Sequence, residues 1–161
     1  MPCSLRCTTR PTRPTPITAG PRAWGGLLDE AFARAERIPD LVLTAHVHNY
    51  QRFMRALEGR QLPYLVAGAG GYWHLHNMAK AADGSKLQTP WAVPDSDVTL
   101  EAYADDRHGF LRLTVTKDAL AGEYTTVPRP QESWSNGPVD VVDSFVVDLA
   151  SHTVATGSNR A

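Results

Sequence analysis

The sequence lacks the features that define several large classes of protein. Cysteine occurs only at Cys3 and Cys7, which is too few for a disulfide framework or a four-cysteine zinc site. No apolar run approaches the roughly 20 residues of a membrane helix, and no apolar signal segment opens the chain. The net charge is −1 with no basic stripe, which argues against a nucleic-acid partner. We therefore expect a soluble protein without membrane contact, and the compartment stays unknown.

Acidic residues are missing from the first part of the chain. The 17 Asp and Glu residues all lie at or beyond Asp29, whereas residues 1–25 are dense in Thr, Pro and Arg. That composition supplies no face that packs, so we expect residues 1–25 to be non-native or disordered, with a transit peptide as a rival interpretation. Residues 26–150 then form the folded part, and residues 151–161 a flexible tail.

The remaining chain has the periodicities of an α/β protein. Leu27–Arg37 carries apolar residues at helical spacing and precedes Pro39, which predicts a helix. The predicted strands are Asp40–Ala45 and Leu62–Ala67, both buried, then Gly109–Thr116, Leu120–Val127 and Ser144–Leu149. The predicted loops are His46–Arg52 and the long stretch Tyr72–Asp106. The pattern indicates a mixed sheet followed by a C-terminal β-hairpin.

Two histidines follow directly on the first predicted strand. His46 and His48 stand at positions i and i+2, which point to the same side in an extended chain. Imidazoles at the carboxyl end of a strand lie where open α/β sheets bind ligands, and they suit zinc, iron and manganese. The pair alone is a weak signal, because amidohydrolases, cupins and metallo-β-lactamases also use it. The chain is too short for the first, and the acidic residues or histidines that the other two need are not in place.

The wider context is more specific. AHVHNYQR, then a spacer and the strand LPYLVAGAGG, resembles the G-H-x-H-x-Y-x-R motif and the strand ending in G-x-G-G of calcineurin-like metallophosphoesterases, especially the purple-acid-phosphatase-like branch. The resemblance runs from about residue 27 to residue 149. It implies that His46 binds the second metal of that family and His48 the first. The further motif or pocket candidates that it marks are Asn49, Tyr50, Arg52, Gly70 and Gly71.

The resemblance implies a fold and a chemistry. The fold would be the C-terminal half of a four-layer α/β sandwich, and the substrate a phosphoester, hydrolysed at two metal ions such as Fe, Zn or Mn. Two substitutions depart from the pattern, Ala45 for a glycine and Gln51 for a glutamate. The family's D-x-H, G-D-x-x-(D/Y) and G-N-H-(D/E) motifs do not occur in this sequence. We therefore expect a fragment that binds metal weakly at most and has little or no activity.

The opening segment has a second interpretation, in which it is read in the wrong frame. The family often carries a segment like HHPPYS…HGGS before the helix, and HHPPYSADTHHGGSPRMG is one segment of that kind. One GC-rich coding of that segment, read one base later, translates as TTRPTRPTPITAGPRAWG, which is residues 8–25 of this chain. We therefore hypothesise a frameshift that ends near Gly25.

Two further groups of residues have weaker interpretations. His74 and His76 form a second H-x-H, which we expect to line a loop, although a pocket role is open. Tyr72, Trp73 and Trp91 are expected to pack on the domain. A half-sandwich would also leave a sheet uncovered, so the alternative to an enzyme fragment is a non-catalytic module that associates with itself or with a separate N-terminal half.

Overall fold

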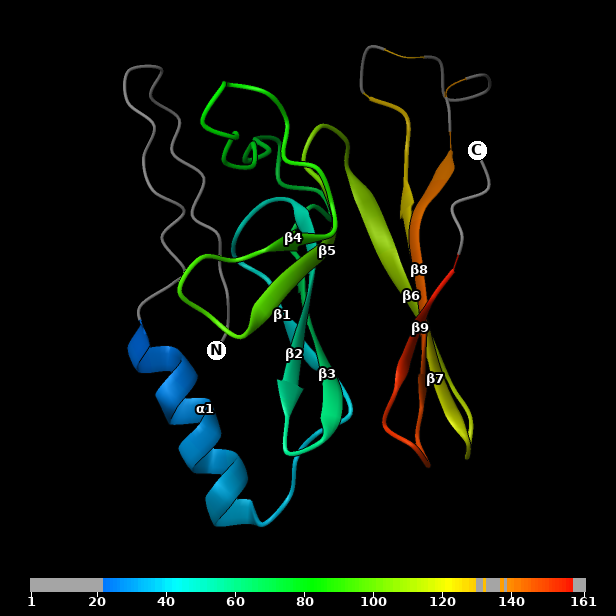
Figure 1. The fold of residues 1–161 in the computed structure, drawn as a ribbon. Coiled ribbons are helices and arrows are strands. Elements are labelled where there is room, and N and C mark those ends of the chain that lie inside the picture. The colour runs from blue at the N-terminus through cyan, green and yellow to red at the C-terminus, as the bar shows by residue number, and fades with distance from the viewer. Residues whose placement is uncertain (1–21, 130–131, 133–136, 138, 158–161) are drawn as a thin grey trace.

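The computed structural model describes residues 22–129, 132, 137 and 139–157. These residues form one helix and two β-sheets (Figure 1). The elements are α1 (Arg22–Ala35), β1 (Val42–Thr44), β2 (Tyr50–Leu57), β3 (Arg60–Ala67), β4 (Trp91–Ala92), β5 (Val98–Ala104), β6 (Gly109–Val115), β7 (Ala119–Thr126), β8 (Asp140–Asp148) and β9 (Val154–Thr156). The first sheet has the order β1-β3-β2-β5-β4 and the second the order β6-β7-β8-β9. In Figure 1, α1 lies on one side of the first sheet and the second sheet on the other.

The α/β class and the mixed sheet are confirmed. β1 pairs parallel with β3, whereas β2 pairs antiparallel with both β3 and β5. The second sheet is antiparallel throughout, and the predicted hairpin is its β6–β7 pair. The two sheets and the helix make three layers in the described residues, so a four-layer sandwich is not confirmed. Among these residues, no helix has the length and apolar character that crossing a bilayer requires.

The helix begins earlier and ends earlier than predicted. It starts at Arg22, within the segment expected to be non-native, while residues 1–21 lie outside the described residues. It ends at Ala35 because Glu36 turns into the left-handed region, with a φ of 48°. The Glu36 amide donates to Ala33 and the Arg37 amide to Phe32, each at 3.1 Å, which is the hydrogen-bond pattern of a Schellman cap. The cap, rather than the proline downstream, therefore ends the helix.

Two of the predicted loops contain strands. β2 begins at Tyr50, inside the expected loop His46–Arg52. The strand was not predicted because Gln51 and Arg52 are polar residues, although buried, and they interrupt the apolar pattern of the sequence. β4 and β5 lie inside the expected loop Tyr72–Asp106. From Val98 to Glu101 this stretch alternates buried and half-buried residues, as a strand with one face on a core does.

Two further predictions need correction. β1 was expected to be buried, but it has three residues at the edge of the sheet, and Leu43 is 53% exposed. The tail after Ala150 was expected to fray, but it continues into β9, which adds to β8. Residues 158–161 lie outside the described residues.

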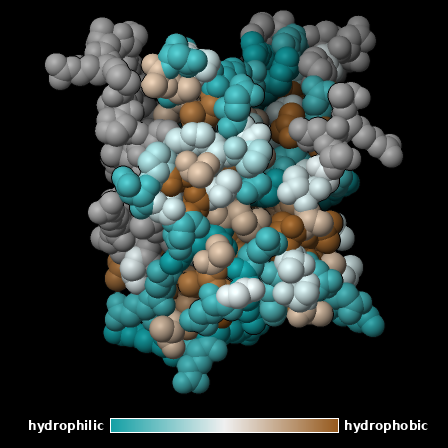
Figure 2. Space-filling model, viewed as in Figure 1, coloured by the Kyte–Doolittle hydropathy of each residue, from teal (hydrophilic) through white to brown (hydrophobic). Residues whose placement is uncertain are grey.

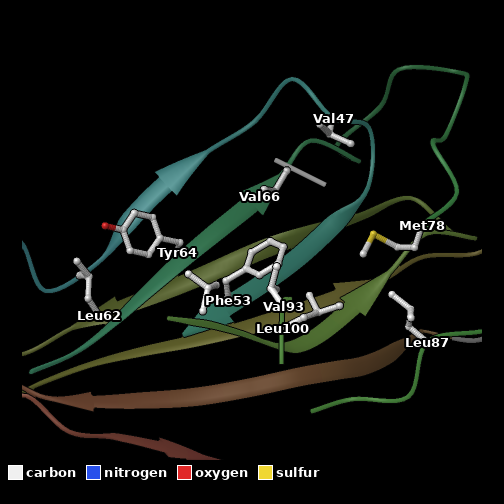
Figure 3. Close-up of a cluster of buried hydrophobic side chains, with 10 residues drawn as sticks. Val47, Phe53, Leu62, Tyr64, Val66, Met78, Leu87, Val93 and Leu100 are labelled. Carbon is white, nitrogen blue, oxygen red and sulfur yellow. The ribbon is translucent and has the colours of Figure 1, made fainter. Parts of the chain in front are cut away.

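The apolar core is divided by the first sheet. On one face, the buried side chains of Phe53, Val66 and Leu100 belong to one cluster (Figure 3). Partly buried Leu28 and Phe32 of α1 pack against this cluster. On the other face, a second cluster joins the two sheets; its buried members are Tyr50, Leu65, Ala104, Tyr124, Phe145 and Val147. Each large apolar side chain buried in this way contributes about 1.5–3 kcal/mol. The start of β2 therefore lies between the layers.

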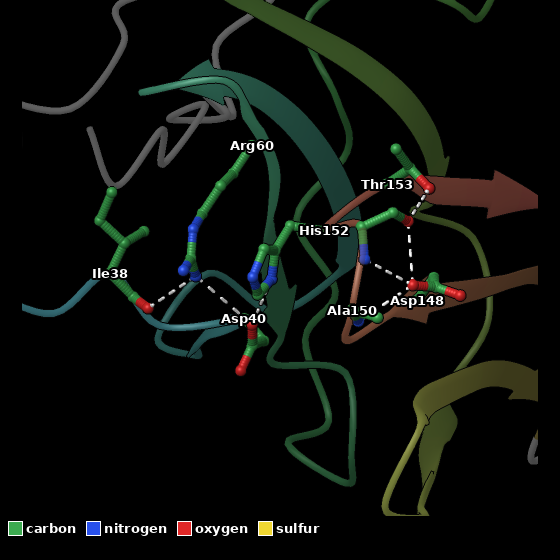
Figure 4. Close-up of polar contacts among 8 residues, drawn as sticks. Ile38, Asp40, Arg60, Asp148, Ala150, His152 and Thr153 are labelled. Atoms are coloured by element: carbon green, nitrogen blue, oxygen red, sulfur yellow. Dashed lines mark hydrogen bonds and ion pairs between the residues drawn. The ribbon is translucent and has the colours of Figure 1, made fainter.

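Polar contacts join the two sheets at the start of β3, the end away from the histidine loop. The backbone N–H of Gln61 donates to the His152 carbonyl oxygen at 2.9 Å. The side-chain Oε1 of Gln61 accepts from the backbone N–H of Val154 at 2.6 Å. His152 Nδ1 lies 3.1 Å from Asp40 Oδ1, and Arg60 lies 3.7 Å from the same oxygen (Figure 4). These side chains are half-exposed, so their ion pairs contribute little to stability.

Candidate functional site

The His46–His48 loop leaves the end of β1 and leads into β2. This placement at a strand exit is the one predicted from the sequence. The two side chains were expected to point to the same side because the chain was expected to be extended. His46 has a φ of 80°, so the chain is not extended there. His46 is exposed, Val47 is buried, and His48 is half-buried. The residue of the loop that takes a positive φ is thus His46 and not Ala45, the position where the family pattern has glycine.

The second H-x-H lies directly against the first. The His48 amide donates to His76 Nδ1 at 3.0 Å, and the His76 amide donates to the His48 carbonyl at 3.0 Å. The two rings are stacked, with centroids 4.5 Å apart and planes at 8°. The Tyr72 ring lies on the same assembly, 4.3 Å from the His48 ring. His76, which was expected to line a loop, therefore lies directly against His48.

The hydrogen bonds fix the proton positions on both stacked rings. His48 Nδ1 lies 2.9 Å from the His74 carbonyl oxygen, which only accepts, so this nitrogen carries the proton. In the neutral ring, Nε2 of His48 then has a free lone pair. His76 Nδ1 accepts from an amide, so its proton is on Nε2. Partial burial, followed by the nearby charges of His48, His74 and His46, lowers the pKa of His76, which favours the neutral ring.

Asn49 holds the two histidine segments together. Its side-chain amide donates to the His76 carbonyl at 2.9 Å, and its Oδ1 accepts from Gln51 at 2.7 Å. Asn49 and Gln51 are both fully buried. A buried amide that makes these bonds cannot be replaced by an apolar side chain without leaving partners unsatisfied. Asn49 therefore supports the site from a fully buried position.

The glycine segment supports the same loop from beneath. The Gly68 amide donates to the Asn49 carbonyl at 3.0 Å, and a Cβ on Gly68 would lie 2.0 Å from the Val47 carbonyl oxygen. Gly68 is thus the glycine that the close approach requires. The predicted pocket glycines, Gly70 and Gly71, are exposed, and a Cβ on either would meet nothing within 4 Å. They carry the chain from Gly68 to Tyr72.

Tyr50 and Arg52 point away from the histidines, into the space between the sheets. Tyr50 Oη donates to Asp143 Oδ2 at 2.7 Å, and Arg52 donates to both oxygens of Asp143 at 2.7 and 2.8 Å. The Tyr50 ring stacks on the Tyr124 ring at 3.9 Å, and the Arg52 guanidinium lies over Phe145. Both motif residues therefore join β2 to the second sheet.

The two buried charges of this junction, on Arg52 and Asp143, are paired with each other. Burial opposes the charge on Arg52, but the hydrogen bonds and charge of Asp143 outweigh burial and raise the pKa of the guanidinium. Burial, and then the charge of Asp143, raises the pKa of Tyr50, so its hydroxyl stays protonated and donates. Sequence reasoning missed Asp143, although a single acid within the apolar run VVDSFVV was a usable signal.

The described side chains around the loop do not by themselves form a group that holds a metal ion. Among residues 22–129 and the other described positions, no group of three or more His, Cys, Asp or Glu side chains converges to hold an ion. The stacking of His48 on His76 sets the two rings face to face, whereas two ligands of one ion direct their nitrogens at a common point. What the loop offers is one oriented imidazole nitrogen, with an exposed histidine nearby.

Comparison with known proteins adds no identification. No protein-family model, no curated protein and no solved structure matches this chain.

Proposed function

We propose that this chain is part of a metal-dependent phosphoesterase of the calcineurin-like class, in the purple-acid-phosphatase-like branch, and that His48 is one of its metal ligands. The observation that carries the proposal is the tautomer of His48. Its Nδ1–H is held by the His74 carbonyl, which leaves Nε2 free at the exit of β1. A metal-binding histidine characteristically donates its other ring N–H to a carbonyl or carboxylate in this way.

The support around the loop is what such a ligand needs. Gly68, Asn49 and the paired amides of His48 and His76 fix the loop by hydrogen bonds and by close packing. An imidazole fixed by its surroundings loses little freedom when it binds an ion, which raises the affinity of the site. His46 is the second proposed ligand, and its exposed side chain leaves it accessible to an ion held partly by other donors.

The residues present do not fit a complete two-metal centre. The family motifs that would supply aspartates and an asparagine are not in this sequence, and the described histidines alone do not converge on an ion. We therefore assign no hydrolytic step to this chain by itself. The two metals, and the hydrolysis of the phosphoester, belong in the proposal to a protein in which further side chains complete the site.

The proposed parent fold is the four-layer α/β sandwich. A fourth layer would cover the face of the second sheet that points away from the first. Phe110, Val141 and Val146 lie on that face by their pairing, and they are 43–53% exposed. Exposed apolar residues gathered on one face are typical of a surface that another element covers.

The coding DNA tests the ancestry. The proposal expects the alternative frame before the codon of Leu27 to encode an HHPP-like segment, preceded by the aspartate motifs. A frame that encodes neither contradicts the proposal.

The activity of two proteins tests the role of the loop. With Mn²⁺ or Zn²⁺, the protein expressed from the restored frame should hydrolyse p-nitrophenyl phosphate, and His48→Ala should lower kcat/KM by a factor of about 100 or more. The control is His152→Asn, at the contact between the two sheets near Gln61. Asparagine readily adopts a positive φ, and His152 has a φ of 53°. This chain alone should show little hydrolysis, and robust hydrolysis that His46→Ala abolishes would contradict its assignment as an incomplete enzyme.

A further inference from the structure

β6 differs from the other edge strands of the molecule in length and in protection. The two sheets end in β1, β4, β6 and β9. β1 and β9 have three residues each and β4 has two, whereas β6 has seven. Proteins protect long edges with proline, a bulge or a charge that points inward. β6 contains no proline, and the irregularity of this sheet lies between β7 and β8. Its one charged residue, Arg112, lies on the face away from the first sheet, where it pairs with Glu123.

The free hydrogen-bonding groups of β6 follow from its pairing with β7. His108 and Thr116 flank the strand, and both bond to the β7 side, through Val127 and Ala119. Every second residue faces the same way, so the backbone groups of positions 110, 112 and 114 also face β7. Those of positions 109, 111, 113 and 115 face outward. The outward N–H of Gly109 confirms this alternation, because it donates to the Ala69 carbonyl at 3.2 Å.

The stretch left for pairing therefore runs from Leu111 to Val115. In the described part of the chain, β6 has no strand on that side. Leu111, Leu113 and Val115 present their backbone N–H and C=O groups along this edge. Their side chains lie on the face toward the first sheet, where Leu113 is 37% and Val115 67% exposed. The edge is thus both unpaired and apolar.

We propose that β6 pairs antiparallel with the β6 of a second copy of this chain, across a two-fold axis at Leu113. Leu113 is the midpoint of the free stretch, so this register uses all of it. Leu113 then lies opposite the partner subunit's Leu113, and Leu111 opposite the partner subunit's Val115, which makes every pair on that face apolar.

The other face of the strand selects the same register. Arg112 lies opposite the partner subunit's Thr114 when the axis passes through Leu113. Moving the axis by one residue, to position 112, would set Arg112 opposite the same residue of the partner, and like charges directly opposite destabilise a sheet. A two-fold interface of one strand with itself closes after two copies, so the product is a dimer with one continuous sheet and not a fibre.

Light scattering on the purified chain tests the dimer. We expect a mass of twice 17.6 kDa at high concentration, dissociating on dilution. L113K sets two ammonium groups opposite each other and should raise the dissociation constant about tenfold or more. V115K, at the most exposed edge position, should act in the same direction without disturbing the fold. The matched control is F110K, which removes an exposed apolar side chain from the other face of the same strand and should leave the dimer intact.

Cross-linking tests the register. In a Cys3→Ser, Cys7→Ser background, R112C mixed with T114C should form a disulfide-linked dimer, whereas neither variant alone should do so efficiently. A monomer at every concentration overturns the proposal. So does a dimer that L113K and V115K leave unchanged, a dimer that F110K disrupts equally, or cross-linking of R112C with itself. If another segment of the same chain pairs with β6 in place of a second copy, the protein stays a monomer, and that result also overturns the proposal.

Discussion

One short stretch of sequence, AHVHNYQR, forms two regions of opposite character. The histidine loop at positions 46–48 is partly exposed and is fixed by backbone contacts with His76. The following residues, Tyr50 and Arg52, are fully buried and bond to a carboxylate in the other sheet. A motif can therefore combine a site with its support, since the residues that make it recognisable need not all contact the ligand.

Asp143→Ala should have the largest effect on this comparison. It leaves the Arg52 charge and the Tyr50 hydroxyl buried without their partner, so the free energy of unfolding should fall by about 3–5 kcal/mol. Urea unfolding measures the effect. The control is Glu123→Ala, which breaks the exposed ion pair with Arg112 and should cost about 1 kcal/mol or less. Equal losses in the two variants would mean that the buried junction has no special role.

Gly68→Ala should disturb the loop from beneath. The new methyl carbon would lie 2.0 Å from the Val47 carbonyl oxygen, so the loop must shift, at a cost of about 1–3 kcal/mol. Gly70→Ala is the matched control, because its methyl group meets nothing within 4 Å. Thermal unfolding compares the two variants, and amide NMR shifts at Val47 and His48 report on the loop. An unchanged loop in Gly68→Ala would show that the close approach is not a constraint.

The smallest expected effect is on the pH dependence of stability. The pKa of His76 is lowered in the folded state, so the folded protein binds fewer protons than the unfolded one once the pH falls below about 6.5. Stability is therefore lost as the pH falls from the ordinary histidine pKa toward the lowered one. His76→Gln keeps an acceptor for the His48 amide but removes the titration, so the slope of unfolding free energy against pH should become shallower there. An unchanged slope would contradict this.

The parts of the fold that the sequence predicted are those with an uninterrupted period. Leu111, Leu113 and Val115 alternate with polar residues, and the β6–β7 hairpin was found as predicted. β2 was not predicted, because its first residues include the polar Gln51 and Arg52. Their burial depends on hydrogen bonds with Asn49 and Asp143, and hydropathy periodicity does not reveal such partners. Long-range satisfaction of buried polar groups cannot be inferred from the pattern along one strand.

The candidate site was predicted to a similar extent. The strand exit at His46 and His48 followed from the apolar run before it, which is a local signal. Their contact with His74 and His76 depends on how the glycine segment turns back, a feature set by tertiary packing. Gly68 was overlooked in favour of Gly70 and Gly71 because all of them look alike in sequence, and only the distance to Val47 separates them.

The proposed metal ligation rests on the tautomer of His48, in which Nδ1 carries the proton and Nε2 carries none. A long-range ¹H–¹⁵N NMR spectrum of the chain at neutral pH measures it directly, since the two ring nitrogens of a neutral histidine give distinct shifts. We predict the Nδ1–H tautomer for His48 and the Nε2–H tautomer for His76. An Nε2–H tautomer at His48 would contradict the account, because the nitrogen assigned to the metal would already carry a proton.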